Sequence, residues 1–351
     1  MNKKCWGCAA WALLLLAGLA RAEVQIQGAG STAAEPIYKV WAAEYQKTSG
    51  VALAYEGIGS SAGMKKIAAN AVHFGASDVA PPEAELQKQG LVLFPIAISG
   101  VVPVVNLPHV RDGQVRLNGE LLARIFQGEI TRWDDAALAA LNPGQRLPSL
   151  AITAVVRADG SGSTYNFSDY LAKLSPAWKN SMGVKTSLAW PSGFTAVKGS
   201  GAVVAAVRQT PGAIGYVDYA YVRDGKLTVA ALQNAQGEFV LPGVEGFKAA
   251  LAQSDWATAG RFSSGLTNQG GKGAWPITMG TYALVPQVSS TPEPTLRALK
   301  FFVWAFMNGD HLVQLSNFVR LPDRIQALAF KSISSVRDSS GQSLGAQLMG
   351  P

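Results

Sequence analysis

Short apolar runs alternate with helix-like patterns through the first hundred residues. Ile37, Val40, Trp41 and Tyr45 recur at i, i+3, i+4 and i+8, which predicts a helix with one apolar face. Residues 62–70 carry the next helical pattern. The runs at 24–26, 51–55 and 72–76 predict strands on either side of these helices. This β-α-β-α-β order predicts an α/β fold with a largely parallel sheet.

Two longer apolar stretches, residues 94–105 and 275–286, read as strands buried on both faces. The simplest interpretation is two domains joined by two strands. We expect the helical pattern at 299–307 to return to the first domain. The tail at 338–351 is polar and contains Gly and Ser, and we expect it to be loosely held.

The first 22 residues read as a secretory signal peptide. Lys3 and Lys4 precede an apolar run that ends in the Ala20-Arg21-Ala22 triplet, and cleavage is expected after Ala22. A transmembrane anchor is the alternative, but the uninterrupted apolar run is shorter than the roughly 20 residues that a span requires. We therefore expect an exported protein with no lipid anchor and a periplasmic location.

Composition and charge exclude several classes of function. Of the 351 residues, 48% are hydrophobic and 15% charged, which is typical of a folded protein. The two cysteines, Cys5 and Cys8, lie in the signal, so the mature chain can use no thiol catalysis, cysteine metal site or disulfide. The signal carries three of the 30 basic residues and none of the 23 acidic ones, so its removal lowers the net charge from +7 to +4. The basic residues form no run with interleaved aromatics, and we expect no nucleic-acid partner.

Three loops share the pattern Gly-x-Gly-Ser-Ser/Thr, at residues 28–32, 57–61 and 160–164. Each follows a predicted strand and precedes a predicted helix. Glycines allow a close backbone approach, and the first N–H groups of a helix have no partner within it. Such helix ends bind anions, and three of them together could hold a tetrahedral oxyanion. The alternative is that these serines and threonines only cap helices.

Three charged residues lie next to these loops. Arg157 ends a predicted strand three residues before the third glycine loop, where its guanidinium could contact an anion, and Asp159 could orient it. A surface ion pair is the alternative. Asp78 follows the third predicted strand, where ligands of open α/β sheets collect. A carboxylate there would accept a hydrogen bond from a protonated anion and repel a fully ionised one, which favours phosphate over sulfate.

The chain resembles the periplasmic phosphate-binding proteins of ABC-type phosphate importers over essentially its whole mature length. The matching segments are residues 28–32, 55–61, 74–78, 157–163, 211–217 and 266–269. The resemblance implies a two-lobed type II periplasmic-binding-protein fold, with two crossover strands as the hinge. Lobe I would comprise residues 23–105 and 277–351, and lobe II residues 106–276. It also implies a monomer without a cofactor or metal, which binds inorganic phosphate in the cleft and delivers it to membrane permease subunits.

The resemblance also assigns the contacts. The implied phosphate ligands are Thr32, Ala33, Ser60, Asp78, Arg157, Ser161, Gly162 and Ser163, with Asp159 holding Arg157. Two of these depart from the family pattern. Ala33 stands where Phe is common, so the backbone N–H contact survives but the cleft loses an apolar wall. Ser163 replaces a Thr and keeps the hydroxyl.

Other functions stay open on the residues alone. The segment 59–63 matches G-x-S-x-G, which would make Ser61 a nucleophile served by one of His73, His109 and His311. A secreted phosphomonoesterase could use the same anion cradle, and a three-histidine metal site is formally possible. Gly28, Gly30 and Ala33 with Glu56 fit a loose dinucleotide fingerprint. Arsenate could replace phosphate as the ligand.

One further glycine-rich stretch lies outside the three loops. Residues 198–201 precede a short apolar helical pattern at 202–207. We interpret this stretch as packing and capping, with lining of the cleft as the alternative.

Overall fold

The computed structural model describes residues 24–348. The predicted signal peptide, its cleavage point after Ala22 and both cysteines lie outside the described residues. Within them, no helix is long and apolar enough to cross a membrane.

The first lobe is built on a mixed sheet with the order β2-β1-β3-β12-β4. Its strands are β1 (Val24–Gly30), β2 (Ala52–Gly57), β3 (Phe74–Ser77), β12 (Thr278–Pro286) and β4 (Leu91–Val105). The first three are parallel, and β12 runs antiparallel to both of its neighbours. Its helices are α1 (Glu35–Ser49), α2 (Ser60–Ala68), α3 (Glu83–Lys88), α12 (Pro292–Asn308), α13 (Asp310–Leu315) and α14 (Asp323–Ser334).

The second lobe continues from the other half of β4, in the order β4-β8-β6-β7. Its strands are β6 (Thr153–Arg157), β7 (Thr195–Val197), β8 (Ala213–Asp218) and β9 (Thr228–Val229), the last paired with β4. Its helices are α4 (Gly119–Phe126), α5 (Ala136–Leu141), α6 (Gly162–Leu174), α7 (Pro176–Ser181), α8 (Ser200–Gln209) and α9 (Tyr219–Gly225). A small separate sheet joins β5 (Arg116–Leu117), β10 (Ala231–Gln233) and β11 (Phe239–Val240).

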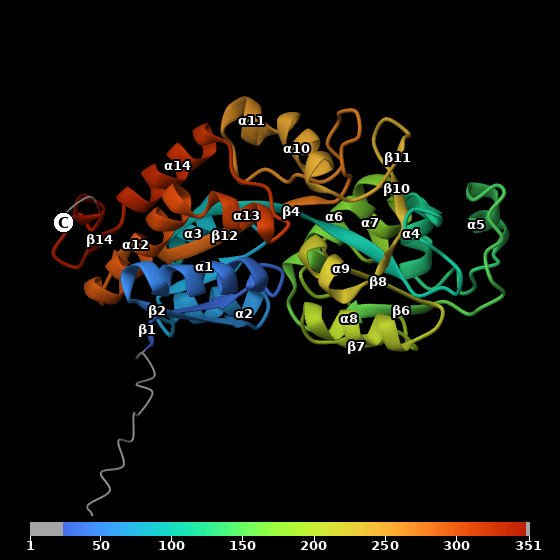
Figure 1. The fold of residues 1–351 in the computed structure, drawn as a ribbon, viewed down its shortest axis with the longest axis horizontal. Helices are drawn as coiled ribbons and strands as arrows, with labels where there is room; N and C mark the ends of the chain where they lie inside the picture. The colour runs from blue at the N-terminus through green and yellow to red at the C-terminus, as the bar shows by residue number, and fades with distance from the viewer. Residues whose placement is uncertain (1–23, 349–351) are drawn as a thin grey trace, which may run out of the picture.

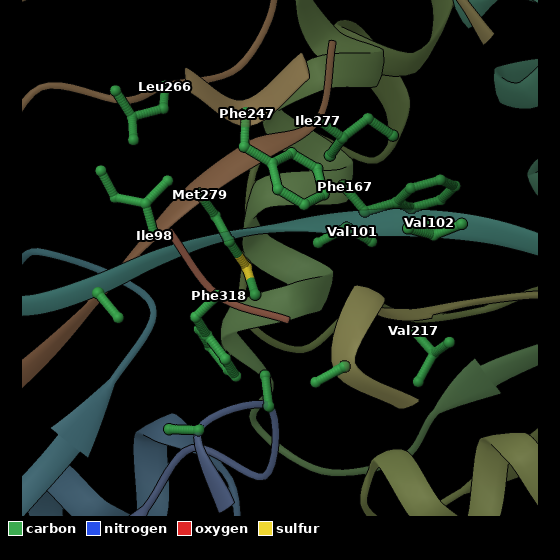
Figure 2. Close-up of a cluster of buried hydrophobic side chains, with 14 of the residues drawn as sticks. Ile98, Val101, Val102, Phe167, Val217, Phe247, Leu266, Ile277, Met279 and Phe318 are labelled. Carbon is green, nitrogen blue, oxygen red and sulfur yellow. The ribbon is translucent and has the colours of Figure 1, made fainter. Parts of the chain in front are cut away.

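The strand β4 passes from one lobe into the other (Figure 1). Its residues up to Gly100 pair with β12, and those from Val101 pair with β8. The returning chain crosses beside it: Val101 donates its N–H to the Ile277 carbonyl at 2.8 Å, and the Trp275 indole donates to the Val101 carbonyl at 3.0 Å. Figure 2 shows Val101, Ile277 and Met279 in this buried region. The predicted two-lobed α/β fold is confirmed. One of the two crossings is the strand β4, whereas the returning chain crosses before β12 begins at Thr278.

A helical segment covers the crossing. Phe247 of α10 (Val244–Ala252) packs against Gly100, where a Cβ would lie 2.3 Å from its ring. Trp256 of α11 (Asp255–Ala259) packs on Tyr282 of β12, with ring centroids 5.6 Å apart. Part of the 106–276 segment therefore also contacts a strand of the first lobe.

The predicted apolar face of α1 is only partly right. Ile37, Trp41 and Tyr45 are buried, but Val40 is 37% exposed, because the stripe that faces the core follows i, i+4 and i+8. The Tyr45 ring contacts Phe301 of α12 at a centroid distance of 5.3 Å. The expected return of the C-terminal helix to the first lobe is therefore confirmed.

The expectation of a loose C-terminal tail is wrong for the residues up to 348. The strand β14 (Arg337–Asp338) pairs in parallel with β13 (Val288–Ser289), and Leu344 is buried. A short 3₁₀ turn, Gly345–Gln347, follows. One apolar side chain and a strand pair are enough to hold a segment whose composition is polar.

Candidate functional site

Four helix N-termini converge where the two lobes meet. The helices α1 and α2 come from the first lobe, and α6 and α8 from the second, each after a strand that ends at the same place. Gly59 shows how closely the lobes approach: its φ is 94°, and a Cβ there would lie 2.6 Å from the Asp159 carboxylate. Only glycine combines this backbone angle with so little space.

The predicted site residues are brought together across the lobes. The Thr32 and Ser200 hydroxyls are 2.8 Å apart, and the Arg157 guanidinium lies 3.5 Å from Ser200. A Cβ on Gly162 would lie 2.7 Å from both Asp78 Cβ and the Ser60 hydroxyl oxygen. The buried side chains among the predicted ligands are Thr32, Ala33, Ser60, Asp78, Arg157, Ser161 and Ser163.

Three serine hydroxyls of the second and third predicted loops have different partners. Ser161 caps α6 by accepting a hydrogen bond from the Thr164 N–H at 3.1 Å. The helix α2 has no side-chain cap, and Ser60 instead accepts from the Asp78 N–H at 3.2 Å. Ser163 is 2% exposed, and its hydroxyl has no hydrogen-bond partner among the described residues. Capping therefore explains one of these three serines and leaves a buried donor unpaired at the site.

Asp78 lies deep in the first lobe, directly after β3. Its two carboxylate oxygens accept hydrogen bonds from Ser31, at 2.5 Å, and from Thr281, at 3.0 Å. Burial raises the pKa of Asp78 to about 6, against the lowering effect of these hydroxyls and of the Arg157 charge.

Arg157 and Asp159 form an ion pair on the facing lobe. The Arg157 Nε donates to Asp159 Oδ1 at 2.7 Å, and its Nη2 donates to the other oxygen. Asp159 also accepts from the Gly199 N–H at 3.1 Å. Burial opposes ionisation of Asp159, but the hydrogen bonds and charge of Arg157 outweigh it, so that the pKa of this carboxyl is lowered.

Further hydrogen bonds close the lobes over the site. The Ser61 N–H donates to the Gly160 carbonyl at 3.1 Å, and Asn166 donates to the Asp78 carbonyl at 2.8 Å. Tyr221 of α9 donates to the Thr32 carbonyl at 2.7 Å. An anion between these helix ends would be shielded from water, where electrostatic contacts are stronger than at a surface.

Three residues at the site were not among the predicted ligands. Residues 198–201 were interpreted as packing and capping, with cleft lining as the alternative; α8 has no side-chain cap and Ser200 faces Thr32 and Arg157, which favours the alternative. The Gly-Ser pair before a helix was the signal that could have found it. Ser31 and Thr281 contact Asp78. No short sequence pattern around Thr281 indicates its role, because it contacts Asp78 only through the pairing of β12 with β3.

The geometry does not support the hypotheses of a serine esterase, a dinucleotide-binding enzyme or a metal site. The Ser61 hydroxyl donates to Thr186 at 3.1 Å, whereas His73 accepts a hydrogen bond from the Gln27 N–H. Glu56, the acidic residue of the dinucleotide fingerprint, forms an exposed ion pair with Lys66. Between residues 24 and 348, no group of three or more His, Cys, Asp or Glu side chains could hold a metal ion.

Comparison with known proteins decides the family. The model of the PBP superfamily domain matches residues 17–303. The phosphate-binding protein PstS of Xylella fastidiosa (strain Temecula1) is 43% identical over 302 residues, covering 86% of this chain and 83% of that protein. The chain belongs to the PBP superfamily and, within it, to the phosphate-binding protein PstS family.

Two further comparisons extend this result. The PstS protein of Pasteurella multocida (strain Pm70) is 42% identical, covering 91% of this chain and 93% of that protein. A structure of the high-affinity periplasmic phosphate-binding protein PfluDING with phosphate bound aligns with a TM-score of 0.69 at 21% identity, covering 87% of this chain and 93% of that one. This structural likeness shows that the two share the two-lobed fold of the PBP superfamily.

Proposed function

We propose that the protein binds inorganic phosphate between its lobes and delivers it to an ABC-type importer. The observation that carries this proposal is the set of buried donors at the meeting point of four helix N-termini, including the unpaired Ser163 hydroxyl and Arg157. Buried polar groups are normally hydrogen-bonded, so an unpaired donor here points to a ligand that accepts. The PstS relatives, named for phosphate binding, support the same conclusion.

In this proposal the protein replaces the hydration shell of phosphate. The direct contacts are Thr32, Ala33 through its N–H, Ser60, Asp78, Arg157, Ser161, Gly162 and Ser163. Asp159 holds the Arg157 side chain in place through two hydrogen bonds. Asp78 accepts a hydrogen bond from the proton that phosphate still carries near neutral pH, and it repels an oxyanion of the same shape that has none.

We propose that the lobes open and close about the two crossings. The division into residues 23–105 with 277–351 and residues 106–276 remains our proposal, with the hinge near Gly100 and Val101, where β4 changes partners. Closure would form the hydrogen bonds between Ser61 and Gly160 and between Asn166 and Asp78. Hinge closure about a ligand is common in binding proteins.

Export and partners complete the proposal. Cleavage after Ala22 would release the mature chain into the periplasm as a monomer, where it would dock on permease subunits. The relatives are named as binding proteins. We propose a binding function without turnover, since Ser61 is hydrogen-bonded to Thr186 rather than to a base.

Calorimetric titration tests the proposal. The mature chain, residues 23–351, would be unfolded, dialysed to remove bound anions, refolded and titrated at pH 7 with phosphate and with sulfate. We expect one-to-one phosphate binding and far weaker binding of sulfate. A refolded sample with native circular dichroism that does not bind phosphate would contradict the proposal.

A further inference from the structure

We propose that Thr281, a residue outside the phosphate contacts given above, determines whether Asp78 is ionised and thereby which oxyanions the site accepts. The inference rests on the proposed phosphate site and adds a positioning residue to it. Thr281 belongs to β12, is fully buried, and donates its hydroxyl to Asp78 Oδ1 at 3.0 Å. An ionised carboxylate only accepts hydrogen bonds, so the hydroxyl must be the donor.

The register of the sheet places Thr281 there. Tyr282 pairs with Ser77, which brings the preceding residue of β12 next to Asp78 at the end of β3. The Ser31 hydroxyl occupies the other oxygen, Oδ2. A donor on each oxygen stabilises the ionised form, in opposition to burial.

Several other ionisable groups face Asp78. Arg157, on the opposite lobe, favours the ionised form of Asp78. Asp218 of β8 has its pKa raised to about 8, mainly by burial and in part by the charge of Asp78, so Asp218 is itself mostly neutral near pH 7. Four tyrosines face it as well: Tyr38, Tyr55, Tyr221 and Tyr282, all with raised pKa values and therefore neutral near pH 7. Asp169 and Lys173 line a small cavity beside Asp78 and pair with each other at 2.8 Å.

The charge of Asp78 decides between two kinds of ligand. When ionised, Asp78 accepts a hydrogen bond from protonated phosphate and repels sulfate. When protonated, it donates to an oxyanion without a proton, and sulfate becomes a ligand. Sulfate affinity should therefore follow the protonated fraction of Asp78. Removing the Thr281 hydroxyl should move that titration to higher pH.

Sulfate titrations from pH 5 to pH 9 test this inference. Sulfate keeps the same charge across this range, so any change reports on the protein. In the wild type we expect sulfate affinity to rise as the pH falls toward about 6. In Thr281→Val, which keeps the side-chain volume, this rise should begin about one to two pH units higher, as expected for a lost hydrogen bond to a charged group. At a fixed pH above both titrations, the sulfate affinity of Thr281→Val should exceed that of the wild type by about tenfold for each pH unit that separates the two titrations.

Two variants serve as controls. Thr281→Ser restores the hydroxyl and should restore the wild-type profile. Thr278→Val removes a buried hydroxyl from the same strand, one that donates to the Trp275 carbonyl, and should leave the profile unchanged. If circular dichroism shows that Thr281→Val does not fold, Ser31→Ala removes the donor to the other oxygen and carries the same expectation.

The outcomes separate this inference from the proposed function. A wild type that does not bind phosphate contradicts the phosphate site itself. A wild type that binds phosphate but shows no sulfate binding even at pH 5 overturns the role given to protonated Asp78. A folded Thr281→Val that binds phosphate with the wild-type sulfate profile, or an equal change of profile in Thr278→Val, overturns the role of Thr281.

Discussion

Asp78 and Asp159 stand at the same site on opposite lobes, and their surroundings differ completely. Asp78 follows β3 and is surrounded by neutral hydroxyls, with a pKa raised to about 6. Asp159 follows β6 and is paired with Arg157, and its pKa is lowered. The residue type therefore does not determine the charge. In the first lobe, Asp78 is a hydrogen-bond acceptor that is costly to ionise, and in the second lobe Asp159 is ionised in a stable ion pair.

This difference shows what can attract an anion here. Asp159 offsets much of the Arg157 charge, and Asp78 adds negative charge when ionised, so the net charge of these three side chains does not favour an anion. The remaining attraction comes from the N–H groups and hydroxyls at the starts of four helices. Such a site would choose its ligand by hydrogen-bond geometry and by the presence of a proton.

The largest effect on binding is expected from Arg157→Ala. This change removes a charged donor from a buried place and should weaken phosphate binding by about 1.5–3 kcal/mol. Arg132→Ala is a matched control, because Arg132 forms the same i, i+2 pair with Asp134 in the same lobe but is exposed. Calorimetry would measure both. Equal phosphate affinity in the two variants would exclude Arg157 from the site.

Asp78→Asn should have the next largest effect. An amide can donate to a fully ionised anion where the carboxylate repels it, so the ratio of phosphate to sulfate affinity should fall at least tenfold, or about 1.4 kcal/mol. Asp159→Asn changes the same residue type on the other lobe and should leave the sulfate affinity at its wild-type value. An unchanged ratio of phosphate to sulfate affinity in Asp78→Asn would count against this account of selectivity.

Ser163→Ala should have a smaller effect. Ser163 offers a buried, unpaired donor, and its removal should weaken phosphate binding by about 0.5–1.5 kcal/mol. Ser168→Ala alters the same helix, but its hydroxyl already donates to the Tyr165 carbonyl, so phosphate affinity should not change. If Ser163→Ala matches the wild type in titrations, the unpaired hydroxyl does not face the ligand.

The local sequence predicted much of this arrangement. The glycine loops, the strand before each of them and the two apolar crossings indicated the two-lobed fold, because each is a short-range pattern of residue types. Arg157 and Asp159 could be paired from their spacing of two residues. Ser200 could also have been predicted, because a Gly-Ser pair precedes its helix, but this pair was interpreted as a cap.

Contacts made through distant pairing could not be predicted in this way. Thr281 is 203 positions from Asp78, and only the register between β12 and β3 brings them together. The packing of Trp256 on Tyr282 likewise depends on the path of the chain after the second lobe. Burial of Leu344, which holds the tail, is a property of the assembled lobe and not of its polar neighbours.

The pH dependence of stability should separate the two aspartates most finely. Asp78 has a raised pKa, so its ionisation costs stability: unfolding temperatures should fall as the pH rises from about 4 through about 6, and Asp78→Asn should make this fall smaller. Asp218, whose pKa is raised to about 8, should cause the part of the fall that remains. Asp159 has a lowered pKa, so its contribution is present above about pH 4 and is lost as the pH falls through its folded value. Asp159→Asn should therefore be less stable than the wild type at pH 7, and the difference should shrink in acid. Changes on the order of 1 kcal/mol would move the melting temperature of a chain of this length by about 1.5 °C, within reach of calorimetry on the ligand-free protein. If the melting temperatures of the two variants depended on pH in the same way, the two aspartates would have similar surroundings, which would contradict the difference between the lobes.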